Sequence, residues 1–233
     1  MAGKNYGKRK QRIPQGCQKT KKSEEEITEI EMFRFTKKEE SLVKKLNTPA
    51  KVQDFLNVLK FNFEKEGETL KSPLATLRAK NAHCLEGALL GAYILSLHGF
   101  TPYVVHLKAS REDYDHVIAP FKVGGFWGAL SKTNHAVLRY REPIYKNLHE
   151  LVMSYFHEYF LDNGVKTLRK YSGLLNLNTF EQGWEREDGN LWGIDEELDK
   201  IKHYDILPRG TLGKLRKADK VEIRAGKIVE FKR

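Results

Sequence analysis

The feature of the sequence that most constrains the fold is an apolar segment that begins at Cys84 and continues to Leu97. It is too short to span a bilayer, and it contains the acidic residue Glu86. We therefore expect a helix packed inside a soluble protein, with Gly99 closing its C-terminal end. The small residues that would let this helix pack close to a neighbouring element are Ala88, Gly91 and Ala92.

Three further helix starts precede this segment. Residues 36–39 read Thr-Lys-Lys-Glu, a capping-box pattern that satisfies two unpaired amides at the start of a helix. Thr48-Pro49 and Ser72-Pro73 each place proline at the first helical position. We expect the helix from Pro49 to continue to Gly67. Its apolar residues at helical spacing are Val52, Phe55, Leu56, Leu59 and Phe63.

Strand patterns follow the apolar segment. Residues 103–108, 116–123 and 126–130 are rich in β-branched and aromatic residues, and Gly124-Gly125 predicts a tight hairpin turn between the last two. A further helix should begin at Asn147. Helices followed by an antiparallel sheet predict an α+β fold in which the cysteine-bearing helix packs on the sheet.

The charge is concentrated at the two ends of the 233-residue chain, which has a net charge of +10. Residues 1–22 hold eight Lys and Arg and no acidic residue, and residues 209–233 hold nine basic and three acidic residues. Subtracting both ends from the totals of 41 and 31 leaves 24 basic and 28 acidic residues in the body. The basic ends suit contact with polyanions, whereas the mildly acidic body does not indicate a dedicated nucleic-acid fold.

These shifts in composition predict three parts. Residues 1–22 are expected to be a disordered basic tail. Residues 23–208 should form the α+β domain, with an irregular stretch over 163–208. Residues 209–233 should form a basic extension that ends in a β-hairpin around Ala225-Gly226.

The chain has two cysteines, Cys17 in the polar tail and Cys84 in the apolar segment. A structural disulfide between such positions is not expected, and a reducing compartment fits free thiols. No apolar run follows the basic start, so the first 22 residues do not resemble a signal peptide. We expect a cytoplasmic protein with no membrane association, and the sequence gives no prediction of its oligomeric state.

A cysteine at a helix start and a histidine at a strand start form the most informative pair in the sequence. The amide groups at a helix N-terminus favour the thiolate, which is the reactive form of Cys84. His116 follows 32 residues later, at the start of the second predicted strand. A helix packed on that sheet could bring the two together, so that the imidazole takes the thiol proton and returns it to a leaving group.

The run CLEGALLGAYILSLHGFTPYVV from Cys84, followed by Asp115-His116-Val117 and by the Gly-Gly turn before Trp127, resembles the transglutaminase-like superfamily. The resemblance covers about residues 72–135. It implies an α+β core related to papain-like enzymes and acyl transfer through a thioester. Members of the superfamily are proteases, amidases and protein crosslinkers, and some have lost activity.

The third member of the site departs from the superfamily pattern. The family places a carboxylate four residues after the tryptophan, and here that position is Ser131. A hydroxyl can orient the imidazole but does not stabilise the imidazolium as a carboxylate does. Asn134 could take the amide role of papain-like enzymes, and we rank the two equally. Asp115 is adjacent to His116 in a strand and should face the opposite side.

An oxyanion hole would combine the backbone N–H of Cys84 with one side-chain donor just before it, either Asn81 or His83. A metal site built from Cys84, His83 and His116 lacks a close-spaced ligand pair. We therefore predict no metal and no cofactor.

Three hypotheses for function follow. The first is an enzyme that acts on an amide or ester, of hydrolase, peptidase or transglutaminase type, through Cys84, His116 and either Ser131 or Asn134. The second is a degenerate domain that binds protein or peptide without turnover, favoured by the missing carboxylate. The third is a nucleic-acid-associated protein that uses its basic ends, weakened by the acidic body. The rate of thiol alkylation separates the first two, because an activated thiolate reacts rapidly at neutral pH.

Overall fold

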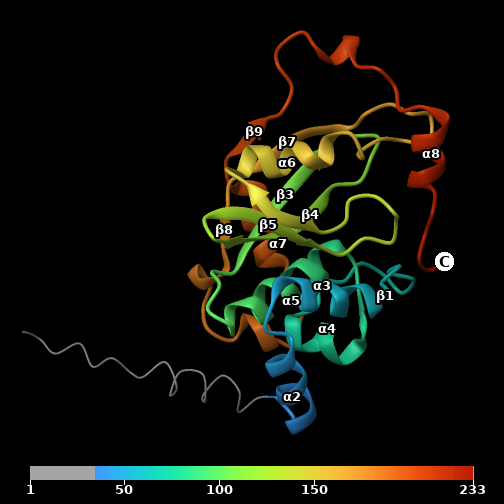
Figure 1. Ribbon diagram of the computed structural model, residues 1–233. Coiled ribbons are helices and arrows are strands. Elements are labelled where there is room, and N and C mark those ends of the chain that lie inside the picture. The colour runs from blue at the N-terminus through green and yellow to red at the C-terminus, as the bar shows by residue number, and fades with distance from the viewer. Residues whose placement is uncertain (1–34, 233) are drawn as a thin grey trace, which may run out of the picture. The chain divides into compact units, whose positions relative to one another are not determined.

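The computed structural model describes residues 35–232 (Figure 1). The chain divides into one unit of Met1–Glu40 and a second of Ser41–Arg233. The predicted basic tail, residues 1–22, lies outside the described residues.

Two of the predicted helix starts are confirmed near the beginning of the described chain. Helix α2 (Lys37–Lys45) opens with the predicted capping box: Glu39 N donates to Thr36 Oγ1 at 3.3 Å, and Thr36 N donates to the Glu39 carboxylate at 2.7 Å. Helix α3 (Pro49–Val58) is capped by Thr48, whose side chain accepts from the backbone of the first turn.

Helix α3 ends at Val58, so the prediction that it continues to Gly67 is wrong. The chain instead forms β1 (Lys60–Phe61), which pairs in parallel with β2 (Asn81–Ala82). Asn62 N donates to the carbonyl of Ala82 at 3.1 Å. This pairing supplies hydrogen-bond partners for the backbone of residues 60–62, which lie beyond the end of α3. It also fixes residues 81–82, just before Cys84.

Helix α4 (Pro73–Ala79) begins where predicted, with Ser72 as its cap. Helix α5 (Cys84–Ser96) follows and is buried along almost its whole length. A Cβ atom added at Gly87 would lie 2.4 Å from Lys132 Cβ, so this glycine permits close approach to the end of β5. Gly91, one of the small residues expected to permit close packing, does so as well, because an added Cβ there would lie 2.7 Å from Leu130 Cδ1.

The sheet is antiparallel throughout, in the order β6-β5-β4-β3-β7-β9, with β8 paired to β3. Gly124 and Gly125, with φ of 58° and 87°, make the predicted turn between β4 and β5. The strands are β3 (Tyr103–Ala109), β4 (His116–Val123), β5 (Phe126–Ser131), β6 (Arg141–Tyr145), β7 (Leu168–Ser172), β8 (Leu175–Asn176) and β9 (His203–Asp205).

Helices cover both faces of this sheet, as Figure 1 shows. Helix α6 (Leu148–Phe156) lies on one face, where its apolar residues join Val105, Leu107 and Ile118 in a continuous core. Helix α5 lies on the other face, where Gly91 approaches Leu130 of β5. The α+β fold class, with a cysteine-bearing helix on an antiparallel sheet, is confirmed.

Residues 163–208 are not irregular, contrary to the prediction. They contain strands β7, β8 and β9, helix α7 (Trp192–Lys200) and two short 3-10 helices, Leu177–Thr179 and Trp184–Arg186. The strands are short and polar on one side, and they are fixed by pairing with β3 and with one another. Such partners are distant in sequence, which is why the local pattern gave no strong strand signal.

The C-terminal β-hairpin prediction is also wrong. After a 3-10 turn (Leu212–Lys214), residues Lys220–Gly226 form helix α8. Asp219 accepts from the backbone of the first turn, and Glu222 accepts from Asp219 N at 2.7 Å, so a capping box decides the local structure. Ala225-Gly226 ends this helix instead of forming a turn between strands.

Within residues 35–232, no helix combines the length and the apolar character needed to cross a membrane.

Candidate active site

Cys84 is the first residue of α5, and its side chain is partly exposed. His83 is the N-cap, and its backbone N–H donates to the Glu86 carboxylate at 3.1 Å in a capping box. The N–H of a first helical residue has no partner inside the helix, so the amide of Cys84 is a donor directed away from α5. The sulfur thus lies at the positive end of the helix.

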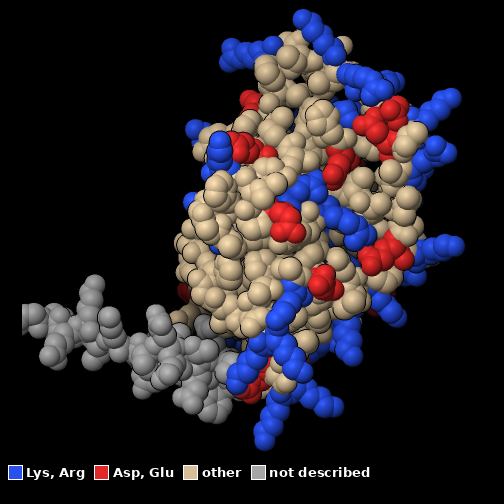
Figure 2. Space-filling model, viewed as in Figure 1, with Lys and Arg blue, Asp and Glu red and all other residues tan. Residues whose placement is uncertain are grey.

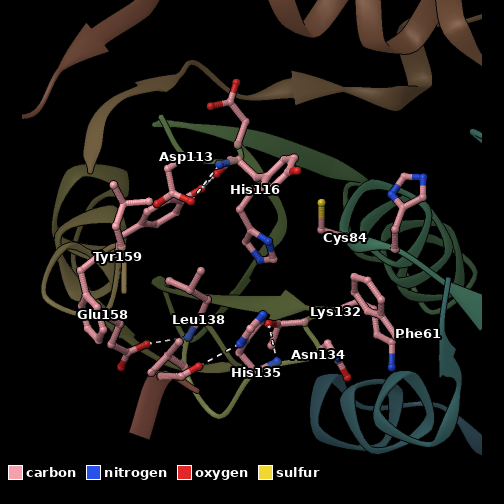
Figure 3. Close-up of a pocket in the computed structure, with 18 of the residues that line it drawn as sticks. Phe61, Cys84, Asp113, His116, Lys132, Asn134, His135, Leu138, Glu158 and Tyr159 are labelled. Atoms are coloured by element: carbon pink, nitrogen blue, oxygen red, sulfur yellow. Dashed lines mark hydrogen bonds between the residues drawn. The ribbon is translucent and has the colours of Figure 1, made fainter. Parts of the chain in front are cut away.

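Two imidazoles act on the thiol of Cys84. Burial opposes its ionisation, but hydrogen bonds from His116 and His83, together with the positive charge of both rings, outweigh burial and lower the pKa of Cys84 to about 5. Figure 3 shows the sulfur beside the His116 ring. The predicted depression of the Cys84 pKa is therefore present, and its main favourable cause is His116.

His116 and Ser131 lie on the same face of the sheet. Ile118 pairs with Ser131 across β4 and β5, and His116 precedes Ile118 by two residues, which is one strand period. The Nε2 atom of His116 lies 2.8 Å from Ser131 Oγ, and both side chains are buried. The hydrogen bond predicted between these two residues is present, and it leaves Nδ1 of His116 for the sulfur.

The hydroxyl of Ser131 has a fixed direction. It donates its proton to the carbonyl of Leu138 at 2.5 Å. A hydroxyl has one proton, so towards His116 it can only accept. This arrangement requires the proton of neutral His116 to be on Nε2 and leaves Nδ1 as the base that faces Cys84. Ser131 thereby sets the tautomer, which a carboxylate would also do.

A short polar network holds the Leu138 carbonyl in place. Leu138 has a left-handed backbone with φ of 60°, which is uncommon for a residue with a branched side chain. Its N–H donates to the Glu158 carboxylate at 2.8 Å, and Glu158 forms an ion pair with Arg141 at 2.7 Å. The contacts therefore run from Arg141 to His116 through Glu158, Leu138 and Ser131.

The backbone of Ser131 is clamped from α3. The side-chain amide of Gln53 accepts from Ser131 N and donates to Ser131 O, each at 2.9 Å, and Gln53 is 5% exposed. Sequence reasoning did not identify Gln53, because it lies 78 residues before its partner. Its one local signal is a glutamine between the apolar positions of a buried helix face.

Asn134, ranked equally with Ser131 from the sequence, does not contact His116. Its amide donates to the Phe231 carbonyl at 2.9 Å and accepts from Phe231 N at 2.8 Å. Both ends of the amide are therefore used by the C-terminal segment. Asp115 faces away from His116, as the strand period predicts, and accepts a hydrogen bond from His106 at 2.9 Å.

The two candidates for the oxyanion donor differ in position. His83 lines the pocket that contains Cys84, and the carbonyl of Thr69 lies 2.8 Å from its Nε2. Asn81 lies on β2 outside the lining of this pocket, and its Oδ1 is buried without a hydrogen bond within the described chain. The structure therefore places His83 beside Cys84 in the pocket, whereas Asn81 lies outside the pocket.

His83 is held as a cation. Burial favours the neutral ring, but a hydrogen bond to Cys84 and the negative charges of Cys84 and Glu86 outweigh it and raise the pKa of His83 to about 9. In the neutral ring, Nδ1 accepts from Leu85 N at 3.3 Å. When Nδ1 is protonated it can no longer accept from Leu85 N, and it donates to the Cys84 thiolate instead. The sequence indicates His83 as a candidate oxyanion donor but not as a second positive charge beside Cys84.

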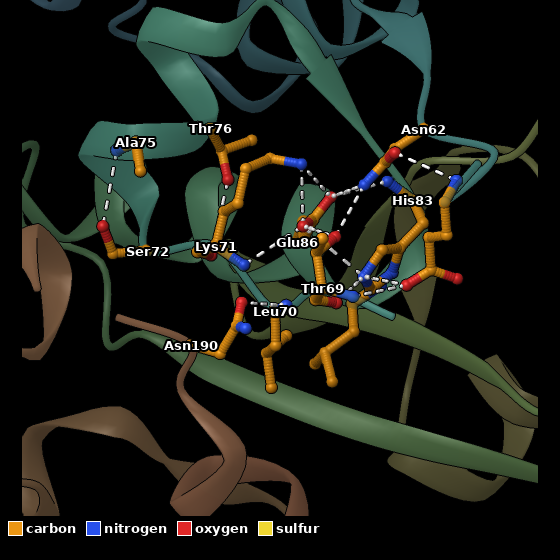
Figure 4. A network of polar contacts seen from close by, with 12 residues as sticks. Asn62, Thr69, Leu70, Lys71, Ser72, Ala75, Thr76, His83, Glu86 and Asn190 are labelled. Carbon is orange, nitrogen blue, oxygen red and sulfur yellow. Dashed lines mark hydrogen bonds and ion pairs between the residues drawn. The ribbon is translucent and has the colours of Figure 1, made fainter. Parts of the chain in front are cut away.

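Glu86 organises the loop beside the cysteine (Figure 4). Its carboxylate is fully buried and accepts from the Lys71 ammonium at 2.9 Å and from Thr69 Oγ1 at 2.8 Å. Burial raises the pKa of Glu86, but His83, Lys71 and Asn62 outweigh it and hold the value below the ordinary range. By fixing Thr69, Glu86 also fixes the carbonyl that holds the His83 ring.

Cys84 and His116 open into a pocket of about 970 Å³. Lys132 also lines it; this residue is 1% exposed and donates to the carbonyl of Leu59 at 2.5 Å. Burial lowers the pKa of Lys132 to about 8, with Glu230 opposing and Arg139 adding to the shift. The acidic residues of the lining are Glu64, Asp113, Asp115, Glu158 and Asp162.

Comparison with solved structures finds LapG of Legionella pneumophila. The calcium-bound form is 15% identical, with a TM-score of 0.35 over 47% of this chain and 72% of that chain. The EGTA-treated form is 12% identical, with a TM-score of 0.38 over 77% of this chain and 98% of that chain. No family model matches the sequence, and no curated protein matches it. The function proposed below rests on the geometry of the site.

Within residues 35–232, no group of three or more His, Cys, Asp or Glu side chains has the geometry of a metal site. His83 and His116 use their ring nitrogens on the protein and on Cys84, so neither is oriented as a metal ligand.

Proposed function

We propose that this protein is a thiol-dependent acyl-transfer enzyme of the transglutaminase-like superfamily, with Cys84 as nucleophile and His116 as general base and acid. The observation that carries the proposal is the ordered series of contacts from Cys84 through His116 and Ser131 to Leu138. Each contact has one chemically consistent direction. Together they give a thiolate, an imidazole of defined tautomer and an open pocket.

The reaction proceeds in two steps. The Cys84 thiolate attacks the carbonyl carbon of an amide or ester, and the carbonyl electron pair moves onto oxygen. When that oxyanion collapses, the bond to the leaving group breaks, and His116 donates its proton to the departing amine or alcohol. A thioester remains. Water or an amine, deprotonated by His116, then attacks the thioester and releases the acyl product and the Cys84 thiol.

The oxyanion forms next to two donors. The backbone N–H of Cys84 is unpaired inside the helix, and the ring of His83 already donates to the sulfur in the free protein. When the sulfur bonds to the carbonyl carbon it loses its negative charge, so the His83 proton becomes available to the oxyanion that forms in the same step. His83 thus serves the thiolate before attack and the oxyanion after it.

A test of acylation uses p-nitrophenyl acetate. The acetyl group should transfer to Cys84 with release of p-nitrophenolate, and peptide mass spectrometry should find the adduct on Cys84. Cys17→Ser is the control for the other thiol, and Cys84→Ala should abolish both signals. His116→Ala should slow acylation by at least about a hundredfold, the lower end of general acid–base contributions. Acetylation at Cys17 alone would contradict the proposal.

A binding module without turnover is the second candidate, and the neutral Ser131 in place of a carboxylate favours it. The two candidates differ after the first acylation. An enzyme continues to release p-nitrophenolate after the initial burst because its thioester is hydrolysed. A binding module with a reactive thiol gives one equivalent and then stops.

A further inference from the structure

The C-terminal segment lies along the wall of the candidate active site. Ile223 and Gly226 of α8 line the same pocket as Cys84 and His116. Beyond α8 the chain turns back and runs beside residues 134–136, which follow β5. The C-terminal segment therefore borders the pocket beside residues 134–136, which begin three residues after Ser131.

Residues 228–231 are held beside residues 134–136 by an isolated antiparallel bridge and its flanking hydrogen bonds. An antiparallel bridge pairs His135 with Val229. Ala136 N donates to the carbonyl of residue 228 at 2.9 Å, and the N–H of residue 230 donates to the carbonyl of residue 134 at 2.8 Å. These contacts use only main-chain atoms, as does a peptide that adds to the edge of a sheet.

The side chain of Asn134 extends this main-chain recognition. Its amide donates to the carbonyl of Phe231 and accepts from the N–H of the same residue, at 2.9 and 2.8 Å. A carboxamide is complementary to a peptide in this way because it offers one donor and one acceptor side by side. Asn134 is 6% exposed, so the contact is built into the protein and not assembled on the surface.

Two side chains of the bound segment contact the protein: Glu230 forms an ion pair with Arg139 at 3.4 Å, and Phe231 lies over Lys132. Ile228 is 62% and Val229 is 41% exposed, so their identities are not read by the protein. The ring of Phe231, in contrast, lies 5.2 Å from the buried ammonium of Lys132. The edge thus binds mainly the backbone of an extended peptide, and it favours an aromatic residue over Lys132 and an acidic residue beside Arg139.

We propose that residues 134–136 form a docking edge for an extended peptide with an aromatic residue over Lys132, and that residues 228–231 of the chain occupy this edge in cis. The inference rests on the proposed function, because it makes the neighbouring pocket the place where a docked peptide reaches Cys84. Residues 228–231 then compete with any peptide that docks from solution.

Competition between residues 228–231 and a free peptide predicts how the apparent Kd of that peptide changes. A tethered segment is present at an effective concentration of about a millimolar or more, so it occupies the edge most of the time. A free peptide binds only to the fraction of molecules whose edge is vacant, and its apparent Kd rises by the inverse of that fraction. Weakening the tethered segment should therefore strengthen binding of the same segment added in trans.

The experiment measures fluorescence anisotropy of a labelled synthetic peptide, GKIVEFKR, which copies residues 226–233. Glu230→Pro in the full-length chain removes the N–H that donates to the carbonyl of residue 134. Glu230→Ala is the matched control, because it removes the ion pair with Arg139 and keeps the N–H. Glu230→Pro should bind the peptide at least about tenfold more tightly than the wild type, and Glu230→Ala should differ little from it.

Two further measurements keep the outcome decisive. Adding Asn134→Leu to Glu230→Pro should weaken binding by at least about tenfold, since the two hydrogen bonds from the Asn134 side chain to the peptide backbone are lost while the main-chain bonds remain. A peptide with alanine in place of Phe231 should bind more weakly to Glu230→Pro, and this comparison leaves the protein unchanged. Equal binding by wild type and Glu230→Pro, or binding that Asn134→Leu does not alter, overturns the docking edge.

Failure of this inference is distinguishable from failure of the proposed function. Peptide binding requires no turnover, so the expected anisotropy pattern with an inert Cys84 would support the edge and sink the enzyme. Acetylation of Cys84 at the expected rate, with no difference among the Glu230 variants, would support the enzyme and sink the edge.

Discussion

Ser131 offers His116 an acceptor without a charge. Its proton is committed to the Leu138 carbonyl, so its lone pair fixes the imidazole tautomer. A carboxylate would add electrostatic stabilisation of the imidazolium, which a hydroxyl does not supply. In this site a second cation, His83, faces the thiolate and contributes to the low pKa of Cys84. The positive charge is thus divided between two rings.

Replacing Ser131 tests the role of its hydroxyl. Ser131→Ala leaves the Leu138 carbonyl and the His116 Nε2 proton without partners, and we expect a loss of about 1–3 kcal/mol in the free energy of unfolding. Acylation of Cys84 should slow by about tenfold, because Asn134 is held by Phe231 and does not substitute. Thermal unfolding and acetylation kinetics measure the two effects.

Ser131→Asp introduces the carboxylate that the transglutaminase-like pattern has at this position, but we expect no gain in thiol reactivity at neutral pH. A carboxylate has no proton for the Leu138 carbonyl, and burial at this 1% exposed position would raise its pKa. Alkylation of Cys84 by iodoacetamide, followed against pH, decides the matter. Faster alkylation than in the wild type would show that the missing charge, and not the hydroxyl geometry, limits the site.

His83 predicts a pH dependence of stability. Its pKa is raised to about 9 in the folded chain, compared with an ordinary value of about 6.5. The protonated ring therefore stabilises the fold fully below about pH 6.5, and the stabilisation is lost as the pH rises through 9. The Tm of the wild type should exceed that of His83→Gln at about pH 6, and the gap should narrow by about pH 10. A constant gap would mean that His83 is not charged.

At the scale of elements, the site depends on how closely α5 approaches the end of β5. Gly87 lies one helical turn after Cys84, and an added Cβ would meet Lys132 Cβ at 2.4 Å. Lys132 directly follows Ser131 and is itself buried. A change in this contact therefore moves the cysteine and the residue that orients His116 relative to each other.

Gly87→Ala should destabilise the protein by about 1–3 kcal/mol, the usual result of overpacking, although alanine is the better helix former. Gly193 in α7 is the matched control, because nothing lies within 4 Å of an added Cβ there. Gly193→Ala should be neutral or stabilising by up to about 1 kcal/mol. Thermal unfolding of both variants measures the difference, and equal effects would mean that the contact with Lys132 adapts without cost.

Local signals predicted some elements well and others poorly. The caps at Thr36, Thr48 and Ser72 place side-chain acceptors next to unpaired amides, so the sequence alone locates these helix starts. Strands β7 and β9 are defined by partners far away in the chain, and no local pattern reports them. In α8 two local patterns competed, and the capping box at Asp219 prevailed over the alternation of apolar residues.

The same distinction applies to the site. The positions of Cys84, His116 and Ser131 follow from a helix start and from the period of a strand, both of which are readable in the sequence. Gln53 and Glu158 act across 78 and 20 residues, and their roles depend on how the layers pack. Asn134 has the right chemistry for an orienting amide, but the C-terminal segment uses it instead.

At the scale of the whole molecule, basic residues gather towards the C-terminal end of the chain. In Figure 2, Lys and Arg side chains cluster at the upper right, where Figure 1 places helix α8. The basic residues of this stretch include Lys214, Arg216, Lys217, Lys220, Arg224 and Lys227. Residues 1–22 carry a similar excess of positive charge in the sequence.

Deleting residues 1–22 should change the Tm by less than about 1 °C, since a polar basic segment contributes little to a core. The deletion should also lower the salt concentration needed to elute the protein from heparin. Each Lys or Arg that is lost removes a contact with an anionic group of the polymer, so binding becomes weaker. Calorimetry and heparin chromatography measure the two effects. Unfolding of the truncated protein would mean that these residues belong to the folded body.

The ionisation of Cys84 is central to the proposed chemistry, and the rate of iodoacetamide alkylation reports it as a function of pH. The measurement uses Cys17→Ser, in which Cys84 is the single remaining thiol. We predict a midpoint near the Cys84 pKa of about 5, and a shift towards higher pH when His116→Ala is added. A midpoint near the ordinary cysteine value of about 8.5, unchanged by His116→Ala, would contradict the account.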